Sequence, residues 1–140
     1  MKYQDILRFW FDELSPRQHF EKNEKLDALI RGRFSETHRA ASRGELFTWR
    51  GTPAGRLAEI IVLDQLSRNL YRDRPEVFAC DGMALVLAQE AVRLGADQTL
   101  PLAQRVFLYM PYMHSESRAI HAIAERLFRQ PEWTPISSTS

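Results

Sequence analysis

An apolar segment that covers nearly every side of a helix is the feature that most constrains how this chain can fold. It carries aliphatic side chains at Leu57, Ile60, Ile61, Val62, Leu63 and Leu66. At about 100° per residue these positions spread around the helix, which is typical of a helix enclosed by neighbours. Thr52 and Pro53 precede the segment with the residue types of an N-cap and a first helical turn. We therefore expect a helix from this start to about Arg72, at the centre of the fold.

Helical periodicity also marks the segments on either side, and no segment alternates polar and apolar residues as a strand does. The expected helical segments are Tyr3 to about Leu14, Asn23 to Gly44, Thr52 to Arg72, Asp73 to Gly95, Thr99 to Pro111, and Ser115 onward. Pro111 should end or kink the fifth of these, because proline removes a helical hydrogen bond. The short loops predict an all-α domain of stacked antiparallel helical hairpins, tetratricopeptide-like in arrangement, although no 34-residue consensus recurs.

Length and composition are those of one folded domain. The chain has 140 residues, of which 44% are hydrophobic and 26% are charged. These values favour a single helical domain over residues 1–130. Residues 131–140 are rich in proline and serine and are expected to form a frayed C-terminal tail.

Charge and cysteine content exclude several classes of function. Lysine and arginine total 19 against 18 aspartates and glutamates, and the basic residues are scattered, so no nucleic-acid surface is expected. No run approaches the roughly 20 apolar residues of a membrane span, and acids interrupt the N-terminal segment where a signal peptide would be apolar. Cys80 is the only cysteine, which rules out an internal disulfide and favours a small core residue. We expect a soluble cytoplasmic protein.

Three acidic residues fall on apolar helix faces, where a charge needs a partner. Asp64 lies within about 40° of apolar side chains on the central helix. Asp81 falls in the apolar stripe of the next helix, and Glu116 at the head of the stripe of the last one. Stranding a charge away from water costs several kcal/mol, so we expect cationic side chains to converge on these acids. Arg68 follows Asp64 by one turn in the favourable order, and the further candidates are Arg56, Arg72 and His114.

Two interpretations of this cluster remain open. In the first, Asp64, Arg68, Asp81 and Glu116 form a buried ion network that fixes how the helices pack. In the second, the cluster lines a pocket in which arginines hold an anionic ligand while an acid orients it or moves a proton. The ligand-binding candidates are Asp64, Arg68, Asn69, Arg72, Tyr112, His114 and Glu116, and the candidate catalytic residues are Glu116 and His114. A sealed cluster would favour the first interpretation, and an open cavity the second.

The histidines give no metal motif. His114, Glu116 and His121 are close in sequence, but Glu116 and His121 diverge by about 140° around a helix, so one ion could hardly reach both. The sequence has no GxSxG or HExxH pattern, and we expect neither a metal nor another cofactor. His19 and His38 have charged neighbours in sequence and are expected to be solvated.

Four segments carry a longer pattern. They are FWFDE at Phe9 to Glu13, TPAGRLAEIIVLDQLSRNLYR at Thr52 to Arg72, FACDGMAL at Phe78 to Leu85, and FLYMPYMHSE at Phe107 to Glu116. Together they resemble the uncharacterised bacterial family called domain of unknown function 924, over the chain to about Phe128. The resemblance implies an all-helical, tetratricopeptide-like fold and no established reaction. The motif positions are Asp64, Gln65, Arg68, Asn69, Tyr71, Arg72, Asp81, His114, Ser115 and Glu116.

The chain departs from this family pattern in two places. Relatives typically have a proline where Ser67 stands. They also continue past the last helix into a segment that resembles RFGRFPHRN and contains arginine and histidine. If that segment closes a pocket in relatives, the corresponding cleft in this chain is expected to be open or inactive.

Three classes of function fit these observations. The first is a soluble helical binding protein with a polar cleft for a small anionic molecule or a peptide end. The second is a metal-independent hydrolase or transferase in which Glu116 or His114 transfers a proton. The third is a structural module that presents a helical surface to a partner protein. Self-association is a further expectation, because a chain without the last segment would expose apolar faces of its final helices.

Overall fold

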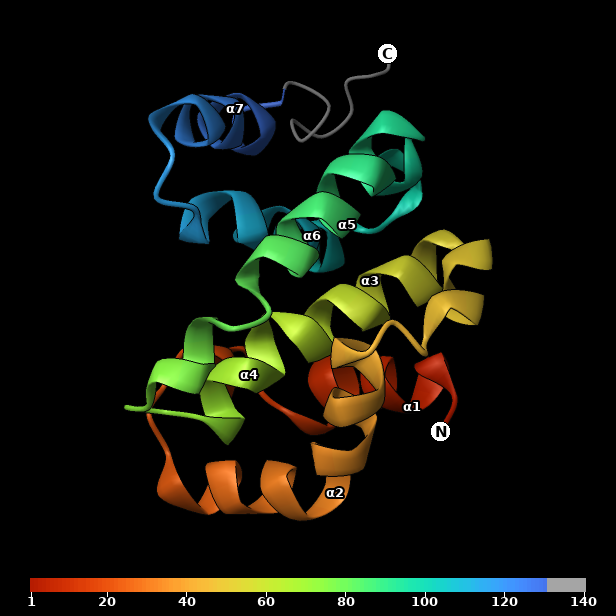
Figure 1. The fold of residues 1–140 in the computed structure, drawn as a ribbon. Helices are drawn as coiled ribbons and strands as arrows, with labels where there is room; N and C mark the ends of the chain where they lie inside the picture. Colours follow the sequence, from red (N-terminus) through yellow and green to blue (C-terminus); the bar gives the residue numbers. More distant parts are fainter. Residues whose placement is uncertain (131–140) are drawn as a thin grey trace.

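The computed structural model describes residues 1–130, which form an all-α fold (Figure 1). The α-helices are α1 Tyr3–Leu7, α2 Glu24–Ser42, α3 Pro53–Leu63, α4 Gln65–Leu70, α5 Asp81–Arg93, α6 Leu102–His114 and α7 Arg118–Phe128. Short helical turns join them: η1 Arg8–Glu13 is a π-helix, and η2 Pro16–His19, η3 Phe47–Gly51, η4 Pro75–Phe78 and η5 Ala96–Thr99 are 3-10 helices. No residue of this range lies in a strand, so the predicted fold class is confirmed.

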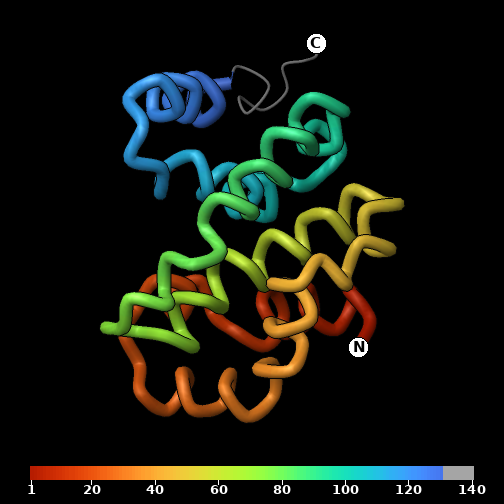
Figure 2. The backbone as a smooth tube through the Cα atoms, in the orientation of Figure 1, coloured from red at the N-terminus to blue at the C-terminus, as the bar shows by residue number. Residues whose placement is uncertain are grey.

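Helix α3 lies at the centre, as the sequence predicts. Its residues from Leu57 to Leu63 are all buried, and it contacts α1, α2, α5 and α6. The tube in Figure 2 shows α1 and α2 on one side of α3 and α4, and α5, α6 and α7 on the other. Helix α3 is therefore enclosed by other helices, as its apolar residues on nearly every side predict. The tetratricopeptide-like arrangement of the hairpins stays a prediction, and the expected tail at residues 131–140 lies outside the described residues.

The start and stop signals of several helices are where the sequence places them. Asn23 caps α2 by accepting a hydrogen bond from the Leu26 amide at 3.1 Å, and Thr52 caps α3 in the same way from Gly55 at 3.0 Å. Gly95 follows α5 with φ of 75°, a conformation that glycine adopts without steric strain. None of the helices in residues 1–130 is long and apolar enough to cross a membrane.

Several helix boundaries differ from the prediction. Helix α5 begins at Asp81 instead of Asp73, after the separate 3-10 helix η4. Helix α6 continues through Pro111 to His114, so this proline neither ends the helix nor shortens it. Ser117, rather than Ser115, caps α7 by accepting a hydrogen bond from the Ile120 amide at 3.3 Å. The later start shifts α7 by two residues and leaves Glu116 outside it.

The single helix expected from Thr52 to Arg72 is interrupted at Asp64, between α3 and α4. The Ser67 hydroxyl donates a hydrogen bond to the Leu63 carbonyl, four residues earlier, at 2.6 Å. A serine that bonds back to this carbonyl competes with the backbone ladder and bends helices. The interruption places the Asp64 side chain at the junction of two helices.

Gly55 in the first turn of α3 is required by close packing. A Cβ atom at this position would lie 2.0 Å from the Trp49 carbonyl oxygen, and backbone atoms on both sides cannot move far. We expect Gly55→Ala to lower the free energy of unfolding by about 1–3 kcal/mol. Gly32→Ala in α2 is the matched control, because nothing lies within 4 Å of its Cβ position. That variant should gain roughly 0.5–1 kcal/mol, and urea unfolding of both variants tests the difference in sign.

Candidate functional site

Asp64 is the centre of a buried polar cluster between α3, α4 and α6. Its side chain is fully buried. Its Oδ1 atom lies 2.9 Å from Arg68 Nη1 and 2.8 Å from His114 Nδ1, and its Oδ2 atom accepts a hydrogen bond from Gln65 Nε2 at 3.1 Å. A carboxylate only accepts, so the Nδ1 atom of His114 carries the proton and its Nε2 atom is left for other contacts.

Arg68 joins this cluster to the start of α5. Its Nη1 and Nη2 atoms donate to the two carboxylate oxygens of Asp81 at 3.0 and 3.2 Å. Nη1 also donates to the Asp64 carbonyl at 3.1 Å. The guanidinium group therefore lies between two acids from different helices, in the bidentate geometry that arginine forms with carboxylates. The convergence expected from the sequence is present for Asp64, Arg68, Asp81 and His114.

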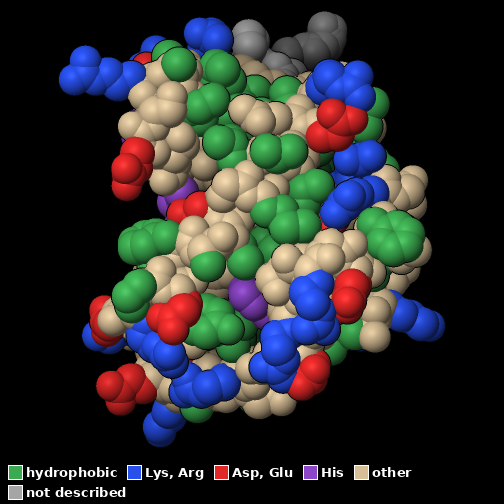
Figure 3. Space-filling view, viewed as in Figure 1, with side chains coloured by type: hydrophobic (Ala, Val, Ile, Leu, Met, Phe, Trp, Pro, Cys, Tyr) green, Lys and Arg blue, Asp and Glu red, His purple; other side chains and the backbone are tan. Residues whose placement is uncertain are grey.

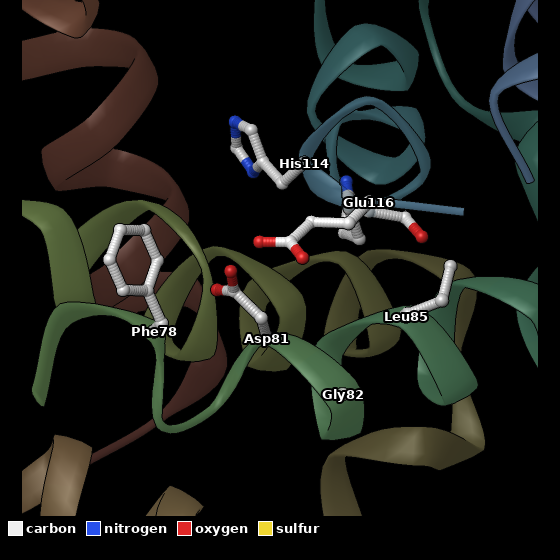
Figure 4. A pocket seen from close by; sticks show the side chains of 8 residues that line it. Phe78, Asp81, Gly82, Leu85, His114 and Glu116 are labelled. Atoms are coloured by element: carbon white, nitrogen blue, oxygen red, sulfur yellow. The ribbon is translucent and has the colours of Figure 1, made fainter. Parts of the chain in front are cut away.

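Glu116 differs from the sequence expectation. It is exposed and precedes α7, and within residues 1–130 it forms neither an ion pair nor a hydrogen bond, so it is not part of the buried ion network. A cap at Ser115 would place Glu116 in the first turn of α7, whereas α7 begins at Arg118. Figure 4 shows the Glu116 carboxylate facing the same hollow as Asp81 and His114. This hollow is a cavity of about 310 Å³ with Phe78, Leu85 and Pro111 among its other walls.

Arg72 pairs with a different acid from the one expected. Its Nε and Nη2 atoms donate to Asp27 of α2 at 2.7 and 3.2 Å, and Asn69 Nδ2 donates to the same carboxylate at 2.9 Å. The hydrogen bonds to Asp27 raise the pKa of the Arg72 guanidinium above its usual value. Arg56, also expected at the cluster, lines a separate cavity with Arg50 and Thr99. Sequence reasoning missed Asp27, although it lies about 20° from Phe34 around α2.

A second cavity, of about 180 Å³, lies between α4 and α6. We call it the arginine cavity. It is lined by Gln65, Arg68 and Asn69 of α4, Arg72 just after α4, Met110 and His114 of α6, and His19, Phe20 and Glu21 from the segment between η1 and α2. Four of the seven ligand-binding candidates therefore meet in one cavity: Arg68, Asn69, Arg72 and His114. His114 also lines the hollow of Figure 4, so the two cavities meet at its side chain.

Tyr112 and Asp64 do not line either cavity. Tyr112 is 3% exposed and belongs to the hydrophobic core, where burial raises its pKa to about 12. Asp64 lies behind Arg68 and His114 and holds both of them. Tyr112 is therefore a core residue, and Asp64 supports the residues that face the cavity.

Charged side chains are locally paired on the surface around α2 and α4. On the face in Figure 3, several Lys and Arg side chains lie near one another in the lower part of the molecule, with Asp and Glu side chains beside them. Arg17 and Glu21 at 2.9 Å and Lys22 and Asp73 at 3.3 Å are examples. Within residues 1–130 no group of three or more His, Cys, Asp or Glu side chains is placed to hold a metal ion.

The expectation that His19 and His38 are solvated is wrong. His38 is buried, with its Nε2 atom 2.7 Å from the Ser67 hydroxyl. That hydroxyl donates its own proton to the Leu63 carbonyl, so Nε2 of His38 is the donor. Cys80 packs beside this pair, with Sγ 4.0 Å from Nε2, and is buried as a core residue. His19 is half-buried and stacks on Trp10 at 4.7 Å.

We expect the stability of the protein to fall as the pH drops below about 6.5. Desolvation lowers the pKa of His38 in the folded protein, so the unfolded chain takes up a proton first, near the ordinary histidine value of about 6.5. The contribution is present above that pH and is lost as the pH falls through the folded value. Urea unfolding at about pH 7.5 and 5.5 measures it. A His38→Gln variant should show a smaller difference, with the half-buried His19, whose pKa is also lowered by desolvation, contributing the rest; equal differences would refute the assignment.

Comparisons with known proteins place this all-helical chain in a family. Residues 6–137 match the family described as "Bacterial protein of unknown function (DUF924)", so the chain belongs to that family, as the resemblance predicts. The solved structure of the protein of unknown function ATU0120 from Agrobacterium tumefaciens is similar, with a TM-score of 0.83 and 36% sequence identity. The match covers 87% of this chain and 69% of that one. No curated protein is significantly similar to the chain.

Proposed function

We propose that this protein binds a small anionic molecule or the carboxylate end of a peptide in the arginine cavity. The observation that carries the proposal is the position of two arginines. Arg68 and Arg72 both line this cavity, and each is held by a buried acid: Arg68 by Asp64, one helical turn earlier, and Arg72 by Asp27 of α2. They are the residues that a carboxylate or phosphate group would contact.

Both arginines have donors left for a ligand. A guanidinium group has five N–H donors. Within residues 1–130, the hydrogen bonds of Arg68 use Nη1 and Nη2, and those of Arg72 use Nε and Nη2. Nε of Arg68 and Nη1 of Arg72 make no hydrogen bond in this range, and the side chains are 24% and 27% exposed. These atoms can donate to an anion without breaking an ion pair.

Arg68 and Arg72 would then have two roles: each forms ion pairs with acids of the fold, and each faces the ligand in the arginine cavity. Asp27, Asp64 and Asp81 fix the inner edges of the guanidinium groups. Fixed side chains lose little conformational entropy when a ligand binds, which favours affinity. The same acids reduce the positive charge of the cavity, so the ligand is held by directed hydrogen bonds more than by net charge.

The size of the cavity limits what it can enclose. Its volume of about 180 Å³ is below the roughly 300–1,000 Å³ of sites that enclose a whole small molecule. The arginine cavity therefore takes the anionic group of a ligand, and the remainder extends along the surface. This requirement fits a peptide end as well as a small carboxylate.

A tryptophan that fills the cavity tests the proposal without replacing any residue of the ion network. Acetate and inorganic phosphate serve as probes, and NMR titration measures their binding. Met110→Trp should weaken binding by at least about tenfold, because a larger side chain occupies the space of the ligand. Met113→Trp is the matched control, since Met113 is exposed on the same helix and lines neither cavity. Equal binding by wild type and Met110→Trp, or no saturable shifts with either anion, would refute the proposal.

The source of the anionic group is tested with a pair of peptides. Acetyl-Ala-Ala with a free carboxylate and the same peptide with a C-terminal amide differ only in the charged end. A peptide end as ligand requires that the acid form binds more tightly than acetate and that the amide form does not. Equal affinities of acetate and the acid peptide would assign the site to a small free anion.

Enzyme activity is a second candidate, supported by the hydrogen bond between Asp64 and His114. A buried acid that holds Nδ1 of a half-buried histidine fixes the tautomer and leaves Nε2 as the proton acceptor, as in proton transfer by histidine. The proposed activity is that of a metal-independent hydrolase or transferase, with His114 as proton acceptor and Glu116 across the hollow. Glu116→Gln should then abolish turnover of any ester substrate found by screening and leave the melting temperature unchanged, because Glu116 is exposed and without partners in residues 1–130. Unchanged turnover would remove Glu116 from the mechanism.

A further inference from the structure

An apolar cavity adjoins the arginine cavity. It has a volume of about 300 Å³ and is lined by Phe11, Leu14, Pro16, Ala103, Val106 and Phe107. His19 and Phe20 line this apolar cavity and the arginine cavity alike. The His19 and Phe20 side chains therefore form the boundary between the two cavities, and a molecule bound in both would pass over them.

The two residues that line both cavities, His19 and Phe20, are aromatic, and contacts with Trp10 hold the His19 ring in place. The His19 ring lies parallel to Trp10, and its Nε2–H donates to the Trp10 carbonyl at 2.6 Å. Phe20 stacks on Phe107 with ring centroids 5.8 Å apart, yet it is 66% exposed. When apolar groups of a ligand cover an exposed phenyl ring at the edge of an apolar cavity, the loss of water-exposed apolar surface favours binding.

The two cavities differ in chemistry. Among the described residues, 1–130, His19 is the only titratable one that lines the apolar cavity, and desolvation lowers its pKa. The arginine cavity presents guanidinium and amide donors from α4. A wholly polar anion would leave the apolar cavity uncovered, and a wholly apolar molecule would leave the arginine donors unused. A ligand with both parts satisfies both cavities.

Building on the proposed function, we propose that the ligand is an amphipathic anion, in which a carboxylate is attached to an apolar body. The carboxylate binds Arg68 and Arg72 in the arginine cavity. The body passes His19 and Phe20 and packs against Val106 and Phe107 in the apolar cavity. Free alkyl carboxylates and peptides that end in an apolar residue share this chemistry.

Affinities for matched probes measure the contribution of each cavity. Acetate supplies the head alone, octanoate adds six methylene groups, and octylammonium has a similar body with the opposite charge. Each fully buried methylene strengthens binding about fourfold, so burial of three or four of the six should make octanoate bind on the order of 100-fold more tightly than acetate. Octylammonium should bind far more weakly than octanoate. Acetyl-Ala-Leu in place of octanoate shows which of the two sources the site prefers.

Two tryptophan variants locate the apolar body. Ala103 is exposed and lines the apolar cavity, so Ala103→Trp should fill it, reduce octanoate affinity to nearly that of acetate and leave acetate binding unchanged. Leu102→Trp is the matched control, because Leu102 is exposed beside it and lines neither cavity. Met110→Trp, which fills the arginine cavity, should weaken both probes.

The outcomes separate this inference from the proposed function. The inference is overturned if octanoate binds no more tightly than acetate, or if it binds Ala103→Trp as tightly as wild type. In either case, binding of acetate still supports the proposed function. Octylammonium that binds as well as octanoate also overturns the inference, because the apolar cavity would then act without the arginines. Absence of binding by both acetate and octanoate overturns both proposals.

Discussion

Replacing Arg68 with methionine should lower the free energy of unfolding by about 3–5 kcal/mol, the range for removing one partner of a buried ion pair. Methionine keeps the apolar stem of the side chain but removes the cation between Asp64 and Asp81. Asp64 is fully buried, and its remaining partners, His114 and Gln65, do not replace a guanidinium group. Urea unfolding monitored by circular dichroism measures the loss.

The control for this variant is an ion pair on the surface. Arg8 and Asp5 form one at 3.1 Å with both side chains well exposed. Arg8→Met should lower the free energy of unfolding by less than about 1 kcal/mol, since water screens the pair. If Arg68→Met lost as little stability as Arg8→Met, water would reach the Asp64 cluster, and the cluster would not hold the helices together.

The part of the cluster that the sequence predicts correctly is local. Arg68 follows Asp64 by one helical turn, and the helical phase alone places both on the same face. Asp81 also meets Arg68, because the apolar stripe of α5 turns that acid toward α4. These contacts need only the pitch of a helix and the rule that an inward acid has a partner.

Pairs between distant segments could not be derived in the same way. Arg72 finds Asp27, 45 residues away, and periodicity says which face an acid occupies but not which helix lies opposite. His38 was misplaced because its sequence neighbours are charged, although it lies one turn after the inward residue Phe34. Its contact with Ser67 joins α2 to α4 and depends on tertiary packing alone.

Errors at helix ends have a separate cause. The apolar stripe of α7 begins at Ile120, and sequence alone does not say whether Ser115 or Ser117 is the cap. Both serines have the chemistry of an N-cap, and the choice decides whether Glu116 points into the core. The position of one acid thus depends on the least certain feature of a helix, its first residue.

Glu59 is a further buried acid, besides Asp27, that the sequence did not single out. It lies in α3, where nearly every neighbour is apolar, and it is 1% exposed. Arg50 donates to both of its carboxylate oxygens at 2.8 Å, and this bond raises the pKa of the Arg50 guanidinium above its usual value. The signal was available, because a charged residue in a helix enclosed on all sides requires a partner.

Arg50→Met should therefore destabilise the protein by about 3–5 kcal/mol, as much as Arg68→Met, since it leaves Glu59 buried without a cation. Its effect on ligand binding should differ. Arg50 does not line the arginine cavity, so Arg50→Met should bind acetate with wild-type affinity at a temperature where both variants are folded, whereas Arg68→Met should bind it at least about tenfold more weakly. Equal stability losses with unequal affinities would show that the Arg68 ion network has a role in binding beyond packing. If Arg50→Met and Arg68→Met bound acetate equally well, the Arg68 ion network would have only a structural role, like the Arg50–Glu59 pair.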